Sequence, residues 1–222
     1  MVELGKFRLA AMHDLAQYAY AGERQTAERE VQSLVRRGLV RKGTFYGPEA
    51  NPRELLTLTK KGYRLLHANQ LISKHQVVHY GFVNARDANH DAHLYRLYQK
   101  EAARIVGLGG RNLRVVLDSE LQRRLRREVA ERGTAARPQI AAQHGLQVVG
   151  NKIPVPDLRI EYETPDGDLA RVNLELVTEN YRGRHLADKV RAGFHLYTPH
   201  GEADHLRRVL DQYELTAEIL SL

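Results

Sequence analysis

The segment IPVPDLRIEYETPDGDLARVNLELV, residues 153–177, decides how the second half of this chain folds. Apolar and polar residues alternate at both of its ends, so each end is predicted to be a strand with one apolar and one polar face. The sequence TPDGD between them, residues 164–168, has the proline and glycine of a tight turn. We therefore predict a β-hairpin here.

The apolar faces of the two strands fix how they pair. If both lie on one side of the hairpin, Leu158 is opposite Leu174, and a slip by one residue would turn one apolar set to the polar side. This register also places Asp157 opposite Glu175. Opposed Cβ atoms on paired strands are roughly 5 Å apart, close enough for two carboxylates to share a cation such as Mg²⁺. The pair is therefore either a metal site or part of an exposed polar sheet face.

Charge is unevenly distributed along the 222 residues, a length sufficient for two domains. Residues 1–144 contain 25 Lys and Arg against 14 Asp and Glu, a net charge of +11, whereas residues 145–222 contain 9 against 13, a net charge of −4. The basic front part predicts a polyanion-binding surface, with nucleic acid as the first candidate, although charge alone also fits a membrane surface.

Several classes of protein are excluded by composition. The chain has no cysteine, so disulfides, thiolate zinc sites and a cysteine nucleophile are ruled out. No hydrophobic run approaches the roughly 20 residues of a membrane-spanning helix. Charged residues interrupt the start of the chain, so we expect no signal peptide and a cytoplasmic protein.

The first 70 residues have the pattern of a helix pair followed by a hairpin and a further helix. Helical spacing and strand propensity predict these elements over residues 7–20, 26–38, 39–46, 54–59 and 60–66. The phrase LVRRGL at residues 34–39, followed by LTLTKKG at residues 56–62, resembles the junction between helix and wing in winged helix-turn-helix domains. The resemblance implies a DNA-binding domain over residues 1–70.

In that fold, the second helix of the pair enters the major groove and the wing touches the DNA backbone. The residues that the resemblance places toward DNA are Gln25, Arg29, Gln32, Ser33 and Arg36 on the helix, and Arg41, Lys42 and Arg53 on the wing. Each of them also fits a solvated surface, and winged helices also dock proteins. The usual leading helix is missing or shrunk to the first few residues, which would leave an apolar edge for a homodimer.

The rest of the chain is predicted to contain a connector and a second domain. Residues 71–110 form the connector, with an amphipathic helix over residues 92–106. Strands and helices then alternate over residues 111–222, which predicts a mixed sheet flanked by helices. Glu120 opens a basic helix that either follows DNA phosphates or forms a solvated face. Its arginines are Arg123, Arg124, Arg126 and Arg127.

Pro156–Asp157, a hairpin and then Glu175 resemble the core motif of the PD-(D/E)XK nuclease superfamily. Together with the front domain, the chain resembles the replication-relaxation family of mobile-element proteins, which occur on plasmids and conjugative elements. The resemblance implies an α+β / α/β fold, with a winged helix-turn-helix followed by a PD-(D/E)XK nuclease-like domain. It implies a double-stranded DNA-binding accessory protein in plasmid replication, relaxation or mobilisation, with duplex DNA and plasmid replication or relaxase proteins as partners.

One residue departs from the nuclease motif. In active members, the two acids hold the metal, and a lysine two residues after the second acid positions or activates the water. The corresponding residue here is Val177, which can neither donate a hydrogen bond nor carry charge. Either Lys189, on a helix expected over residues 182–194, reaches the site, or the site does not cut DNA. Glu120 could supply a third ligand, as helix acids do in that superfamily.

Three functions therefore remain open. The first is a DNA-binding accessory protein with a degenerate nuclease-like domain. The second is an active endonuclease that uses Mg²⁺ or Mn²⁺, with Asp157 and Glu175 as metal ligands and Lys189 as the relocated lysine. The third is a winged-helix transcriptional repressor whose rear domain dimerises or senses a ligand.

Overall fold

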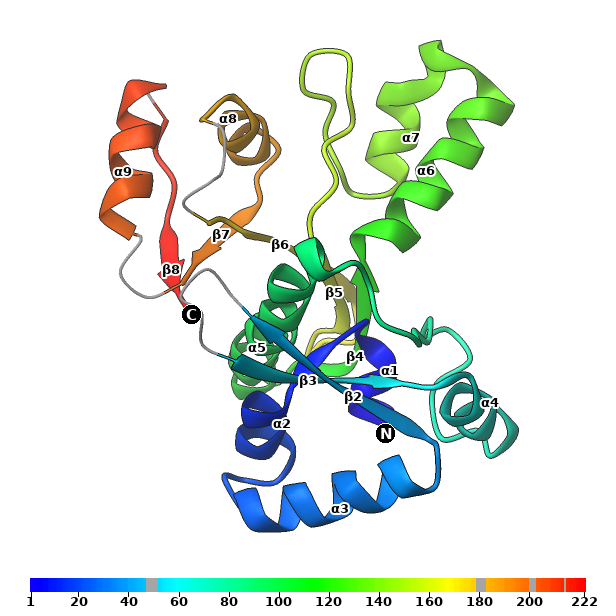
Figure 1. The fold of residues 1–222 in the computed structure, drawn as a ribbon. Coiled ribbons are helices and arrows are strands. Elements are labelled where there is room, and N and C mark those ends of the chain that lie inside the picture. The colour runs from blue at the N-terminus through cyan, green and yellow to red at the C-terminus, as the bar shows by residue number, and fades with distance from the viewer. Residues whose placement is uncertain (47–51, 179–182, 200–202, 214) are drawn as a thin grey trace. The chain divides into compact units, whose positions relative to one another are not determined.

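The structure, a computed structural model, describes residues 1–46, 52–178, 183–199, 203–213 and 215–222. They form a mixed α+β structure with two sheets (Figure 1). The chain divides into two compact units, Met1–Gln99 and Lys100–Leu222. The boundary falls within helix α5, Ala85–Gly107, inside the stretch expected to connect two domains. Within the described parts of the chain, no helix combines the length and hydrophobicity that crossing a bilayer requires.

The first unit contains a three-stranded antiparallel sheet in the order β1–β3–β2. Its elements before α5 are α1 (Val2–Lys6), β1 (Ala10–Ala11), α2 (Met12–Ala19), α3 (Arg24–Arg36), β2 (Val40–Tyr46), β3 (Pro52–Leu58) and α4 (Lys60–Ala68). Thr59 caps α4, because its hydroxyl accepts the N–H of Gly62 at 3.1 Å. Leu9, Leu55 and Ala88 belong to a buried cluster that joins the sheet to α5.

The prediction of a helix over residues 7–20 is wrong for its first five residues. Ala10–Ala11 pair with β3 instead, and the helix begins at Met12. Phe7 is only 1 % exposed, and its ring packs edge-on against Tyr95 of α5 at 5.3 Å. The apolar residues before the helix therefore enter the core through extended backbone, which helical spacing cannot distinguish from a helix face.

Two further expectations about the front of the chain change. The helix expected over residues 26–38 begins two residues earlier, at Arg24, and ends at Arg36. The leading helix α1 has five residues, but it does not leave an apolar edge. Leu4 and Phe7 are each 1 % exposed, and α5 supplies the aromatic residues that cover Phe7. The loop expected between the two strands lies mostly in residues 47–51, outside the described residues.

The second unit contains a five-stranded mixed sheet in the order β4–β5–β6–β7–β8. Strands β4, β5 and β6 are antiparallel, whereas β7 runs parallel to β6 and β8 runs parallel to β7. The elements are β4 (Arg111–Leu117), α6 (Asp118–Arg132), a 3₁₀ turn (Thr134–Ala136), α7 (Arg137–Gln143), β5 (Leu158–Glu163), β6 (Leu169–Leu176), α8 (Gly183–Arg191), β7 (His195–Thr198), α9 (Ala203–Gln212) and β8 (Ile219–Ser221). Residue 182, the expected start of the Lys189 helix, lies outside the described residues.

The predicted hairpin register is confirmed, with Leu158 opposite Leu174. The alternative of an exposed polar face does not hold at the end near Asp157, because Arg159 and Glu175 on that face are each only 1 % exposed, whereas Arg171 at its other end is exposed. The residues that cover this end of the face come from helices α6 and α7, from the loop before β5 and from the segment just before β7. A strand pattern defines two faces but does not reveal that part of the polar face is covered as well.

Helix α7 was not among the expected elements. Its residues Ile140 and Ala141 are fully buried with Leu121 and Leu125 of α6, and this cluster continues to Phe194. Figure 1 shows α6 and α7 as neighbouring helices beside the loop that leads into β5. The two helices and this loop therefore build one wall over the polar face of the sheet.

Candidate functional site

Asp157 and Glu175 meet at one end of the hairpin, as the predicted register requires. The backbone N–H of Asp157 donates to Glu175 Oε2 at 3.2 Å, and the backbone N–H of Leu176 donates to Asp157 Oδ2 at 3.0 Å. Each carboxylate therefore accepts a hydrogen bond from the other strand. These bonds fix the two side chains beside each other before β5 and at the end of β6.

Lys189 reaches this carboxylate pair from helix α8. Its Nζ lies 2.6 Å from Glu175 Oε1 and donates to the carbonyl oxygen of Val155 at 2.6 Å. Helix α8 crosses over between the parallel strands β6 and β7, so the crossover carries the lysine to the carboxyl end of β6. Val177 instead is fully buried in an apolar cluster with residues such as Leu186. The position at which the motif lysine was expected is thus part of the core.

The donor set fits a hard divalent cation in part. Two neighbouring carboxylates are the usual protein contribution to a Mg²⁺ or Mn²⁺ site, with water and phosphate oxygens completing the shell. Lys189 already pairs with Glu175, so a cation would share that carboxylate with an ammonium group. Among the residues that the structure describes, no group of three or more His, Cys, Asp or Glu side chains could hold a metal ion.

Glu120 lies in a different polar network. It pairs with Arg114 of β4 and with Arg124 one turn further along α6, and Arg114 also donates to Glu161 at 2.8 Å. Burial raises the pKa of Glu120 above its usual value, and the two arginines oppose this shift. The network ties α6 to the first two strands. Asp118, which was not predicted from the sequence as a site residue, is bonded directly to the Asp157 backbone. Its N–H donates to the Asp157 carbonyl oxygen at 3.2 Å.

Arg159 adds a buried positive charge to the covered face of the sheet. It donates to Asn173 Oδ1 and to the backbone carbonyl of His144, both at 2.8 Å, while its Nη2 has no partner. Burial lowers the pKa of Arg159 to about 10. The guanidinium is therefore still charged at neutral pH, two residues from Asp157 on the same strand face.

Helix α3 presents a polar face to solvent. Ala27 and Val31 are buried on its inner side. The exposed predicted residues are Gln25, Arg29, Gln32 and Arg36, and Ser33 is half-buried. Arg29 and Arg36 form no ion pair with any described residue. Their charges are therefore available to an anion.

The predicted wing residues are partly engaged within the first unit. The Arg41 guanidinium lies 4.7 Å from the centre of the Phe82 ring, and Lys42 pairs with Glu54 at 2.6 Å. Arg53 donates to Asn89 Oδ1 at 2.8 Å and contacts a ring nitrogen of His93 at 3.1 Å. Arg41 and Lys42 are exposed, whereas Arg53 is half-buried and tied to α5. Helix α3 thus presents more positive charge without an ion-pair partner than the β2–β3 hairpin does.

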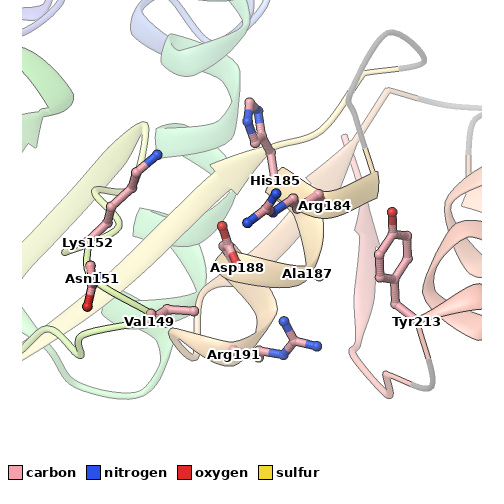
Figure 2. Close-up of a pocket in the computed structure, with 10 residues that line it drawn as sticks. Val149, Asn151, Lys152, Arg184, His185, Ala187, Asp188, Arg191 and Tyr213 are labelled. Carbon is pink, nitrogen blue, oxygen red and sulfur yellow. The ribbon is translucent and has the colours of Figure 1, made fainter.

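The second unit contains two hollows that were not predicted from the sequence. One has a volume of about 790 Å³, with Asn151 and Lys152 on one side and Arg184, His185 and Asp188 of α8 on the other (Figure 2). The other, of about 740 Å³, lies against α6 and includes Lys189 in its wall. The sequence signalled this second hollow only through the arginine run of α6. The other cations that line the hollow come from segments distant in the sequence.

No protein-family model matches the chain, and neither a curated protein nor a solved structure matches it.

Proposed function

We propose that this protein is a double-stranded DNA-binding accessory protein of a mobile genetic element, in which the first unit acts as a winged helix-turn-helix. In this proposal, α2 and α3 are the helix pair and the hairpin β2–β3 is the wing. The observation that carries it is the exposed face of α3, where Arg29 and Arg36 form no ion pair with any described residue. The role in plasmid replication, relaxation or mobilisation rests on the family resemblance.

The chemistry of this face suits duplex DNA. The major groove is about 12 Å wide and admits an α-helix. Arginine forks bind phosphate or guanine edges, and glutamine pairs with adenine, so a helix face of these residues can both hold and read a groove. Ala27 and Val31 anchor the opposite side of α3 in the core, which keeps the polar face turned outward.

Replacing Arg36 with alanine should weaken binding to duplex DNA about tenfold at moderate salt, as expected for the loss of one arginine contact to phosphate or base. Fluorescence anisotropy with a labelled duplex measures this change. Arg64→Ala is the matched control, since Arg64 is exposed on α4 of the same unit. Equal affinities for wild type and Arg36→Ala would remove α3 from the interface.

A second candidate function, a metal-dependent endonuclease, is favoured by the contact between Lys189 Nζ and Glu175 Oε1 at 2.6 Å. Asp157 and Glu175 would hold Mg²⁺ or Mn²⁺. When bound, the cation would supply a nucleophilic water and neutralise charge on the phosphate. Lys189 would place a further positive charge at the same point, which the residue at Val177 cannot do.

The test is cleavage of supercoiled plasmid with and without Mn²⁺, analysed on gels after deproteinisation. Asp157→Asn is the informative variant, because the amide keeps an oxygen that can accept the Leu176 N–H. A working nuclease should produce nicked or linear DNA that is lost in this variant. Cleavage that persists in the variant would come from another source, and a mobility shift without cleavage would leave DNA binding as the function.

A further inference from the structure

The hollow of about 740 Å³ in the second unit has an apolar floor and a basic rim. Leu125 and Val129 of α6 form the floor together with Ile153 and Val155 of the segment that leads into β5. We refer to it as the α6 cleft. Cavities of roughly 300–1,000 Å³ hold organic ligands of moderate size. A few nucleotides of one strand fit this range, whereas a duplex is too wide to enter.

The rim of the α6 cleft carries one sign of charge. Arg126, Arg137 and Lys152 line it together with Lys189, and no carboxylate is among its lining residues. Arg126 donates to Gln122 at 3.2 Å, and Arg137 donates to the backbone carbonyl of Asn151 at 2.8 Å. Neither these two arginines nor Lys152 forms an ion pair with a described residue. Neutral groups orient the two arginines, and the charges of all three residues remain uncompensated.

Three segments bring this charge together. Arg126 comes from α6, Arg137 from the start of α7, and Lys152 from the turn at Val149–Lys152, which a pair of backbone hydrogen bonds closes. The contact between Arg137 and the Asn151 carbonyl joins the second of these segments to the third. A cluster of cations from separate segments, held by hydrogen bonds, is suited to successive phosphates of a nucleic acid backbone.

We propose that the α6 cleft binds a single strand of nucleic acid, with its phosphates on Arg126, Arg137 and Lys152 and its sugars and bases against the apolar floor. The cleft lies on the second unit and does not depend on α3, so this site adds to the duplex-binding function proposed for the first unit. Lys189 is shared between the cleft wall and the Glu175 carboxylate. A strand held in the cleft would therefore lead toward the Asp157–Glu175 pair.

Two double variants of the full chain that remove equal charge test this proposal. Arg126→Gln/Lys152→Gln removes two cations of the cleft. Arg123→Gln/Arg127→Gln removes two exposed arginines of the same helix that do not line it. Binding of a short labelled single-stranded DNA is measured by anisotropy over a series of salt concentrations. The cleft variant should bind roughly tenfold more weakly and lower the salt slope by about 1.4, the value for two phosphate contacts.

The control variant should retain affinity close to wild type. Equal losses in both double variants would show a diffuse electrostatic effect and overturn the proposal, as would unchanged binding by the cleft variant. A loss of duplex binding without a loss of single-strand binding would also overturn it.

Arg29→Ala/Arg36→Ala separates this site from the proposed duplex-binding function, because it should weaken duplex binding and spare single-strand binding. Circular dichroism verifies that every variant is folded.

Discussion

Glu175 is a carboxylate with 1 % of its surface exposed, and Lys189 stabilises its charge in that position. Removing an ion from water costs several kcal/mol, and an opposite charge with good geometry is needed to offset this cost. Lys189 supplies the charge at 2.6 Å, and the Asp157 N–H satisfies the other carboxylate oxygen. The contact between Lys189 and Glu175 therefore stabilises the fold of the second unit.

Lys189→Met should destabilise the second unit by about 3 kcal/mol at neutral pH, since the variant leaves a buried carboxylate without its ammonium partner. Urea unfolding measures the change. Adding Glu175→Gln to this variant should restore a substantial part of the loss, because the uncompensated charge is then gone. If the double variant is less stable than Lys189→Met, the carboxylate does not depend on Lys189.

At the scale of elements, the β5–β6 hairpin followed directly from its sequence, because strand alternation and turn chemistry are local. The approach of Asp157 to Glu175 followed from the same register. The covering of the polar face did not, since it depends on α7, whose apolar residues are too few for a clear helical period. The α6 cleft could not be predicted for a related reason, because its cations lie on three segments that only the tertiary structure brings together.

The junction between α4 and β2 depends on the absence of one side chain. A Cβ at Gly62 would lie 2.2 Å from the carbonyl oxygen of Leu39, within the LVRRGL and LTLTKKG phrases that suggested the domain. Gly62→Ala should cost about 2 kcal/mol, because this overlap outweighs the higher helix propensity of alanine. Urea unfolding followed by circular dichroism tests this. Gly107→Ala, where nothing lies within 4 Å, is the control and should be neutral or stabilising.

At the scale of the whole molecule, the structural boundary changes how the charge is distributed. Residues 1–99 contain 15 Lys and Arg against 9 Asp and Glu, a net charge of +6, and residues 100–222 contain 19 against 18, a net charge of +1. The division at residue 144 gave an acidic rear part because it assigned residues 100–144, with 10 Lys and Arg against 5 Asp and Glu, to the front. The basic helix belongs to the second unit, which therefore has its own cationic surface.

The two units should differ in their response to acid. Burial, with the nearby Arg53, lowers the pKa of His93 in the first unit from 6.5 to about 4. The unfolded chain therefore binds this proton at higher pH than the folded chain, so stability is complete above about pH 6.5 and falls as the pH approaches 4. Between pH 7 and pH 5 the first unit should lose about 2 kcal/mol from this group.

Unfolding in urea at pH 7 and pH 5 measures this loss. His93→Gln should reduce it, because the glutamine oxygen can still accept from Arg53 but does not titrate in this range. If the variant shows the same decrease between the two pH values as wild type, another group is responsible. A unit whose stability falls with acid while its neighbour remains folded would give two separate transitions at pH 5.

The crossover from β6 through α8 to β7 also bears on the order in which the second unit folds. The β5–β6 hairpin forms from strands that are neighbours in sequence, whereas the parallel pairing of β6 with β7 requires closure of residues 177–194. Until α8 docks, Glu175 lacks its contact with Lys189, and burial of its charge is less favourable. Docking of α8 is therefore the step that allows the polar face to be sealed, and amide exchange during refolding would show α8 protected after the hairpin.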